Sequence, residues 1–169
     1  MQLTESLTAS AGDPRVAGFK SIVCYRTGLD VAPFLEDESG EQLFDAFQYL
    51  VKQYEKEKHI RLAHKYFNDY VVQLTLEIAG NYHKPGIVQA NCPYTLNSPS
   101  IFVVQFHTGL GDNDIDLLRS SPSHLQPVIK AYPQTIFVLL HSSYPYTRDA
   151  GYLTAVYSNV FLDFGEVLS

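Results

Sequence analysis

The fold is decided by residues 103–114, which read Val103-Val104-Gln105-Phe106-His107-Thr108-Gly109-Leu110-Gly111-Asp112-Asn113-Asp114. A short apolar run here ends in a histidine and continues at once as an acidic loop with two glycines. The design recurs at residues 136–145, where Ile136-Phe137-Val138-Leu139-Leu140 is followed by His141-Ser142-Ser143-Tyr144-Pro145. Residues 160–166 repeat it without a histidine, and residues 19–28 form an earlier copy. Each run is typical of a buried strand that delivers a polar group to a site.

These apolar runs show little alternation, and helix-like segments separate them. That pattern predicts an α/β fold of parallel strands buried on both faces and joined by helical crossovers. In open α/β sheets and in closed (β/α)8 barrels alike, functional sites lie at the carboxyl ends of the strands. We therefore expect the residues that follow each strand to carry the function.

Composition narrows the class of protein further. The chain has 169 residues, of which 46% are hydrophobic, so it can bury the core of one domain. It is too short for a complete (β/α)8 barrel, which typically takes ~250 residues. The net charge of -6 and the lack of a basic stripe argue against a nucleic-acid partner, because that binding neutralises phosphates with Lys and Arg. Cys24 and Cys92 form neither a disulfide framework nor a metal-binding knuckle.

The N-terminus carries no targeting pattern. Residues 1–6 lack the basic and apolar regions of a signal peptide, and no apolar run approaches the ~18 residues of a membrane-spanning helix. We expect a soluble, cytoplasmic protein with no membrane partner.

The chain before residue 103 divides into a lead-in, a strand and two helices. Residues 1–15 are rich in Ser, Thr, Ala and Gly and are interpreted as a loose lead-in to a domain over residues 16–169, or else as the end of an element whose partner is missing. The first strand is expected within residues 16–25. A capping-box pattern at residues 39–42 predicts a helix start, and the helix would bury an aromatic stripe in the core. The stripe consists of Phe44, Phe47, Val51 and Tyr54.

A second helix is predicted from Phe67 to Ile78, ending before Gly80. One crossover normally takes one helix, so one of the two is an addition at the rim of the barrel. After residue 103 the pattern is tighter: Pro127 suits the first turn of a helix, and Thr147 is a candidate N-cap for another.

His107 and His141 are the candidate metal ligands. Neighbouring parallel strands lie ~4.8 Å apart, so two imidazoles at adjacent strand ends can reach one ion. A single strand-end histidine is more often a hydrogen-bonded structural residue, and it is the matched pair that favours a metal site. Arg26, after the first strand, could hold a substrate carboxylate. Asp163 and Glu166, near the end of the last strand, could orient a water or a ligand, and Glu166, being further out, is the preferred candidate. Lys20 lies six residues before Arg26, so it is expected near the end of the first strand that faces away from the candidate site.

Residues 105–114 and 141–146 closely resemble the amidohydrolase-like domain of fungal FluG-type proteins. In these, and in plant nodulin/glutamine synthetase fusions, the domain precedes a glutamine synthetase-like domain. Residues 18–29 and 162–166 match as well, so the resemblance covers the chain from about residue 16 to residue 169.

The resemblance implies a (β/α)8 barrel of the metal-dependent hydrolase type. Its ligands come from a His-x-His pair on strand 1, histidines on strands 5 and 6, and an aspartate on strand 8. His107 fits the strand 5 position and His141 the strand 6 position. The other ligands have no counterpart here, so the chain is expected to be a partial barrel, about strands 4 to 7. Residues 86–102 depart from the family and are interpreted as an insertion or a gene-model artefact such as translated intron, or else as a lineage-specific loop.

The activity implied for the parent domain is hydrolysis of a C–N bond in a small-molecule substrate by a metal-activated water, with zinc as the expected ion. A metal-dependent decarboxylase on a similar barrel is one alternative. A non-catalytic regulatory or assembly module beside a glutamine synthetase-like domain is another. A His-x-His pair upstream would favour an enzyme. The chain alone is expected to be inactive, because two imidazoles leave the ion under-coordinated.

Overall fold

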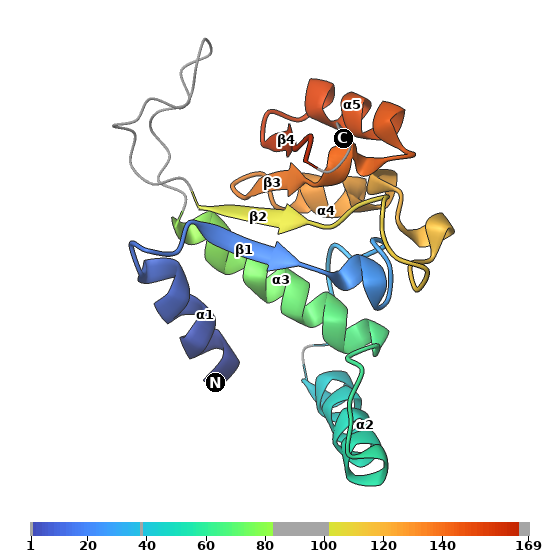
Figure 1. The fold of residues 1–169 in the computed structure, drawn as a ribbon. Helices are drawn as coiled ribbons and strands as arrows, with labels where there is room; N and C mark the ends of the chain where they lie inside the picture. Colours follow the sequence, from blue (N-terminus) through green and yellow to red (C-terminus); the bar gives the residue numbers. More distant parts are fainter. Residues whose placement is uncertain (1, 38, 83–101, 166–169) are drawn as a thin grey trace.

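The core of the molecule is one sheet of four parallel strands. The computed structural model describes residues 2–37, 39–82 and 102–165. The strands β1 (Gly18–Ser21), β2 (Val103–Phe106), β3 (Ile136–Leu139) and β4 (Val160–Leu162) lie in the order β1-β2-β3-β4, as Figure 1 shows. The predicted α/β fold with parallel strands is therefore confirmed.

The two faces of the sheet are buried to different extents. Phe106 pairs with Leu139, and Val104 pairs with Phe137. These four side chains are at most 1% exposed. Gln105 and its partner Val138, on the opposite face, are only partly buried, and Lys20 beside Gln105 is exposed. Since paired residues of parallel strands point to the same face, helices cover one face of the sheet more completely than the other.

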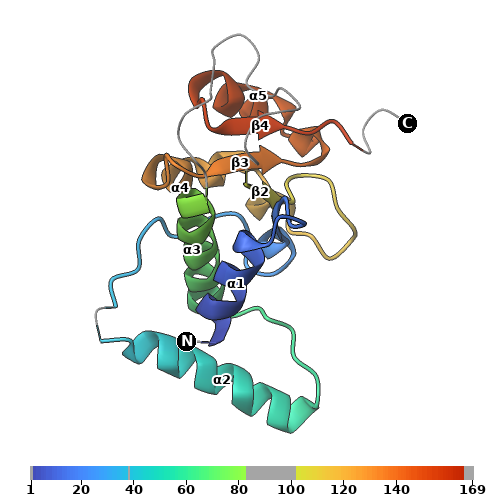
Figure 2. The same cartoon turned by 90° about the vertical axis from the view of Figure 1, so that its left-hand side faces the viewer.

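Five α-helices lie before and between the strands in the described residues, and some of them supply that cover. They are α1 (Gln2–Gly12), α2 (Glu41–Glu57), α3 (Lys65–Tyr82), α4 (Gln126–Ala131) and α5 (Thr147–Val156). Helix α3 packs against β1 and β2, and α5 packs against β4. Figure 2 shows α2 lying across α3 on the side away from the strands. It is the additional helix that the sequence predicted. It starts at Glu41, close to the predicted position, but the predicted capping box does not form: the N-cap is Gly40 without a side-chain capping bond, and the Gln42 amide donates to the Glu36 carbonyl. No helix in these described ranges is both long and apolar enough to cross a membrane.

The interpretation of residues 1–15 as a loose lead-in is wrong for residues 2–12. Helix α1 forms there and contacts α3, with Ala11 buried and Leu7 packed against the core. Leu3, Leu7 and Ala11 recur every four residues, which is the spacing of one helix face. The many Ser and Thr residues around them obscured that stripe.

The predicted burial of the α2 aromatic stripe is also wrong. Phe44, Phe47 and Tyr54 are 61%, 51% and 53% exposed. Helix α2 faces α3 with its small and aliphatic side, where Ala46 and Leu50 are buried. The prediction that the second helix ends before Gly80 is wrong as well, because α3 continues through Gly80 to Tyr82. Of the predicted insertion at residues 86–102, all but Phe102 lies outside the described residues.

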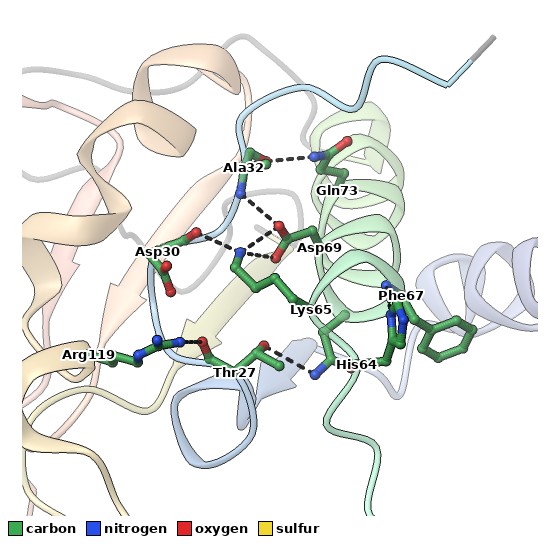
Figure 3. A network of polar contacts seen from close by, with 10 residues as sticks. Thr27, Asp30, Ala32, His64, Lys65, Phe67, Asp69, Gln73 and Arg119 are labelled. Atoms are coloured by element: carbon green, nitrogen blue, oxygen red, sulfur yellow. Dashed lines mark hydrogen bonds and ion pairs between the residues drawn. The ribbon is translucent and has the colours of Figure 1, made fainter. Parts of the chain in front are cut away.

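A polar network ties the loop after β1 to helix α3, as Figure 3 shows. Asp69, only 3% exposed, accepts from the Lys65 ammonium at 2.6 Å and from the Ala32 backbone N–H at 3.2 Å. The same ammonium donates to the Asp30 carbonyl at 2.7 Å. One turn further along α3, the Gln73 amide donates to the Ala32 carbonyl at 2.6 Å. The loop that leaves β1 is therefore fixed at several points.

Replacing Asp69 with Ala should lower the free energy of unfolding by ~2 kcal/mol, since the Ala32 N–H loses its acceptor and the Lys65 ammonium loses its carboxylate partner and keeps only the Asp30 carbonyl. Urea denaturation measures the change. Asp45→Ala, at an exposed position of α2, is the matched control and should stay within ~0.5 kcal/mol of the unchanged chain. Equal stability of the two variants would contradict the role assigned to this network.

Candidate functional site

His107 and His141 meet at the carboxyl ends of β2 and β3. Their ring centroids are 4.6 Å apart, and Nε2 of His141 lies 3.2 Å from Nδ1 of His107. Each residue is 8% exposed. The two histidines that the sequence singled out are therefore brought together in space.

The convergence depends on an unusual backbone turn after β3. Because Phe106 pairs with Leu139, His107 stands level with Leu140, and His141 comes one residue later. Continued alternation would turn His141 to the opposite face from His107. His141 instead has φ 62°, and Ser142 and Ser143 follow at 49° and 54°. Left-handed conformations are strained for such residues and gather at functional sites.

Asp163, just beyond β4, anchors this turn. Its carboxylate accepts from the His141 backbone N–H at 3.3 Å, and its carbonyl oxygen accepts from the Ser142 N–H at 2.7 Å. Asp163 thus stabilises the backbone that presents His141.

The surroundings of His107 fix which of its ring nitrogens carries the hydrogen. Nε2 lies 2.5 Å from the carbonyl oxygen of Leu110. A carbonyl only accepts, so Nε2 carries the hydrogen and Nδ1, which faces His141, carries the lone pair. Histidines that bind metals commonly use the other ring nitrogen in this way.

The spacing of the two nitrogens suits a shared ion. Two nitrogen ligands of a tetrahedral ion, each at ~2.0–2.1 Å, lie about 3.3 Å apart. The observed 3.2 Å is close to that value. In the part of the chain that the structure describes, no group of three or more His, Cys, Asp and Glu side chains is arranged to hold a metal. The described residues thus offer two ligands.

Two buried hydroxyl groups join the turns that carry the histidines. Thr108 Oγ1 donates to the Leu140 carbonyl at 2.8 Å and lies 2.7 Å from Ser143 Oγ. Both residues are 0% exposed. Sequence reasoning missed this pair, although a hydroxyl residue near each strand-end histidine was a visible signal.

Tyr25, also missed, forms a wall of the site. Its ring centroid lies 4.4 Å from that of His107. Burial raises the pKa of the Tyr25 phenol, and the Asp112 and Asp114 carboxylates raise it too, while a hydrogen bond with the Asp112 backbone opposes them. At neutral pH the wall is therefore an uncharged phenol. The sequence signal that could have identified Tyr25 is its position directly before the candidate residue Arg26.

The remaining predicted site residues lie elsewhere. Arg26 is half-buried and lines a hollow beside β1. Neither His107 nor His141 is part of the lining of that hollow. Glu166 lies outside the described residues. The placement of Lys20 near the opposite end of its strand is wrong: β1 ends at Ser21, one residue later, because residues 23–25 form a 3-10 turn instead of continuing the strand.

Gly109→Ala should destabilise the chain by at least ~2 kcal/mol, because Gly109 has φ 63° and an added Cβ would collide with the backbone carbonyls of Ser143 and Tyr144. Gly151→Ala, in α5, is the control: a Cβ there meets nothing within 4 Å, so stability should rise by ~0.5–1 kcal/mol. Thermal or urea unfolding compares them. Similar shifts for both would show that the loop after β2 is not packed on the turn after β3.

Comparisons with known proteins show what the chain is similar to. An amidohydrolase family model matches residues 102–169. Protein fluG of Emericella nidulans is 49% identical over 155 residues, which is 92% of this chain and 16% of that protein. The crystal structure of a protein described as a metal-dependent hydrolase from Lactobacillus casei superposes with a TM-score of 0.67 and 29% identity, covering 95% of this chain and 36% of the other.

The chain thus spans about a sixth of the curated relative and just over a third of the solved chain. Its four consecutive parallel strands and crossover helices are consistent with part of a (β/α)8 barrel. The chain belongs to the amidohydrolase-related family of FluG-type domains and corresponds to a part of such a domain.

Proposed function

We propose that this chain supplies part of the metal site of a hydrolase domain that cleaves a C–N bond in a small-molecule substrate. The observation that carries the proposal is the 3.2 Å approach of His141 Nε2 to His107 Nδ1. The hydrogen bond between His107 Nε2 and Leu110 adds support, because it leaves Nδ1 as the ligand nitrogen.

The residues present fit two positions of a divalent metal site. Imidazole nitrogens suit zinc among other ions, and a catalytic zinc usually takes three protein ligands. Bound there, such an ion would polarise the substrate and lower the pKa of a water molecule to ~7. The further ligands would come from the His-x-His pair and the aspartate that the family resemblance implies for the parent protein.

The chain's own residues would orient and enclose the site. Asp163 holds the turn that presents His141, and the Thr108–Ser143 hydroxyl pair fixes the spacing of the two strand ends. Tyr25 covers one side of His107 and limits access of water. Arg26 and Glu166 are proposed to contact the substrate.

In the full-length protein encoded by the transcript, His107→Ala or His141→Ala should weaken zinc affinity by at least ~100-fold, more than the loss of an outer partner costs. Metal content after dialysis and calorimetric titration measure this. His124→Ala is the control, since its ring contacts the Leu118 carbonyl and lies on a separate 3-10 turn. Full zinc content in either site variant would overturn the metal assignment.

The 169-residue chain by itself should bind zinc more weakly than micromolar and show no hydrolase turnover, because two imidazoles leave a zinc ion short of its usual ligands. Titration with zinc, followed by assay on amide and lactam substrates, measures both. Stoichiometric sub-micromolar binding together with turnover would contradict the expectation.

A further inference from the structure

A hollow of about 690 Å³ beside β1 is lined by apolar and by basic side chains. Phe19 from β1 and Phe67 and Val71 from α3 supply apolar wall. The charged lining residues carry three positive charges and one negative, in a chain whose net charge is -6. They are Lys20, Arg26, Arg61 and Asp114. A local excess of positive charge in an acidic protein favours an anionic ligand.

Two guanidinium groups converge in the lining of this hollow. Arg26 Nη1 and Arg61 Nη2 both donate to the backbone carbonyl of Tyr25, at 3.3 and 3.0 Å. Both groups are therefore within reach of one oxygen atom, and like charges held so close repel each other. An anion between them would relieve that repulsion.

The carboxylates of the described residues compensate this charge only in part. Asp114 lies 3.1 Å from Arg61, but the two side chains are 43% and 47% exposed, so water screens their attraction. Within residues 2–37, 39–82 and 102–165, no carboxylate forms an ion pair with Arg26 or Lys20. Arg26 is half-buried and retains donors that a carboxylate could accept in the bidentate manner.

We propose that Arg26 and Arg61 form a binding site for the carboxylate of a small organic acid whose apolar part rests against Phe19, Phe67 and Val71. Lys20, an exposed residue that also lines the hollow, adds to the positive potential. The site adjoins the histidine pair through Tyr25, which precedes Arg26 and whose ring lies 4.4 Å from that of His107. Taking the bound acid as the substrate rests on the proposed function, whereas the binding itself does not.

The test is calorimetric titration of the full-length protein, stripped of metal with a chelator, with benzoate at low ionic strength. Arg26→Gln and Arg61→Gln should each weaken benzoate binding by roughly ten-fold or more, as expected for the loss of hydrogen bonds to a charged group. Arg26→Lys should restore part of the affinity. Arg148→Gln, at an exposed arginine of α5, is the matched control and should bind like the wild type. Circular dichroism establishes that each variant is folded.

Benzyl alcohol and inorganic phosphate serve as comparison probes. Wild-type protein should bind benzyl alcohol and phosphate more weakly than benzoate. The proposal is overturned if benzoate does not bind, if Arg26→Gln and Arg61→Gln bind it as the wild type does, or if either comparison probe binds as tightly. Because no metal is present, failure here leaves the metal site standing. If His107→Ala loses zinc binding but still binds benzoate, the carboxylate site stands even where the metal site is lost.

Discussion

The parallel register of β2 and β3 is the constraint on which the site depends. Pairing of Phe106 with Leu139 anchors both strands in the core, and it leaves the two histidines one residue out of step. The left-handed backbone at residues 141–143 removes that mismatch. Such a conformation persists only where surrounding contacts hold it, and Asp163, Thr108 and the closely packed Gly109 supply them. The strain of the turn and the packing around it thus belong to one arrangement.

A second set of contacts stabilises the other side of the site. The Asp69–Lys65 pair on α3 holds residues 30–32, and Asn68 donates to Thr27 at 3.2 Å. Arg119 donates to the Thr27 carbonyl from the opposite direction. Tyr25 and Arg26 begin this loop, so α3 restrains the segment that contacts His107. Helix α3 therefore connects the covered face of the sheet with the rim of the site.

Sequence reasoning reached the strands and their histidines because both are local signals. Apolar runs such as Ile136–Leu139 mark buried strands, and the residue that breaks each run marks its carboxyl end. The left-handed turn at His141 has no such signal, since non-glycine residues rarely adopt it. The exposure of Phe44 depends on which face of α2 meets α3, which periodicity alone does not specify. Arg61 is distant from Arg26 in the sequence and comes close to it only in the folded chain, so no local sequence pattern could indicate its role.

The order of the strands in the sheet also bears on how the protein folds. Each strand pairs only with the strands that precede and follow it in the sequence, as β1-β2-β3-β4 requires. From β2 onward, short segments separate the partners, so each pairing closes a small loop at low entropic cost. Synthesis releases the chain from its N-terminus, so the sheet can grow by one strand at a time as each βα unit leaves the ribosome. The histidine pair would be held in place only after β4 has docked, because Asp163, just beyond β4, anchors the turn that presents His141.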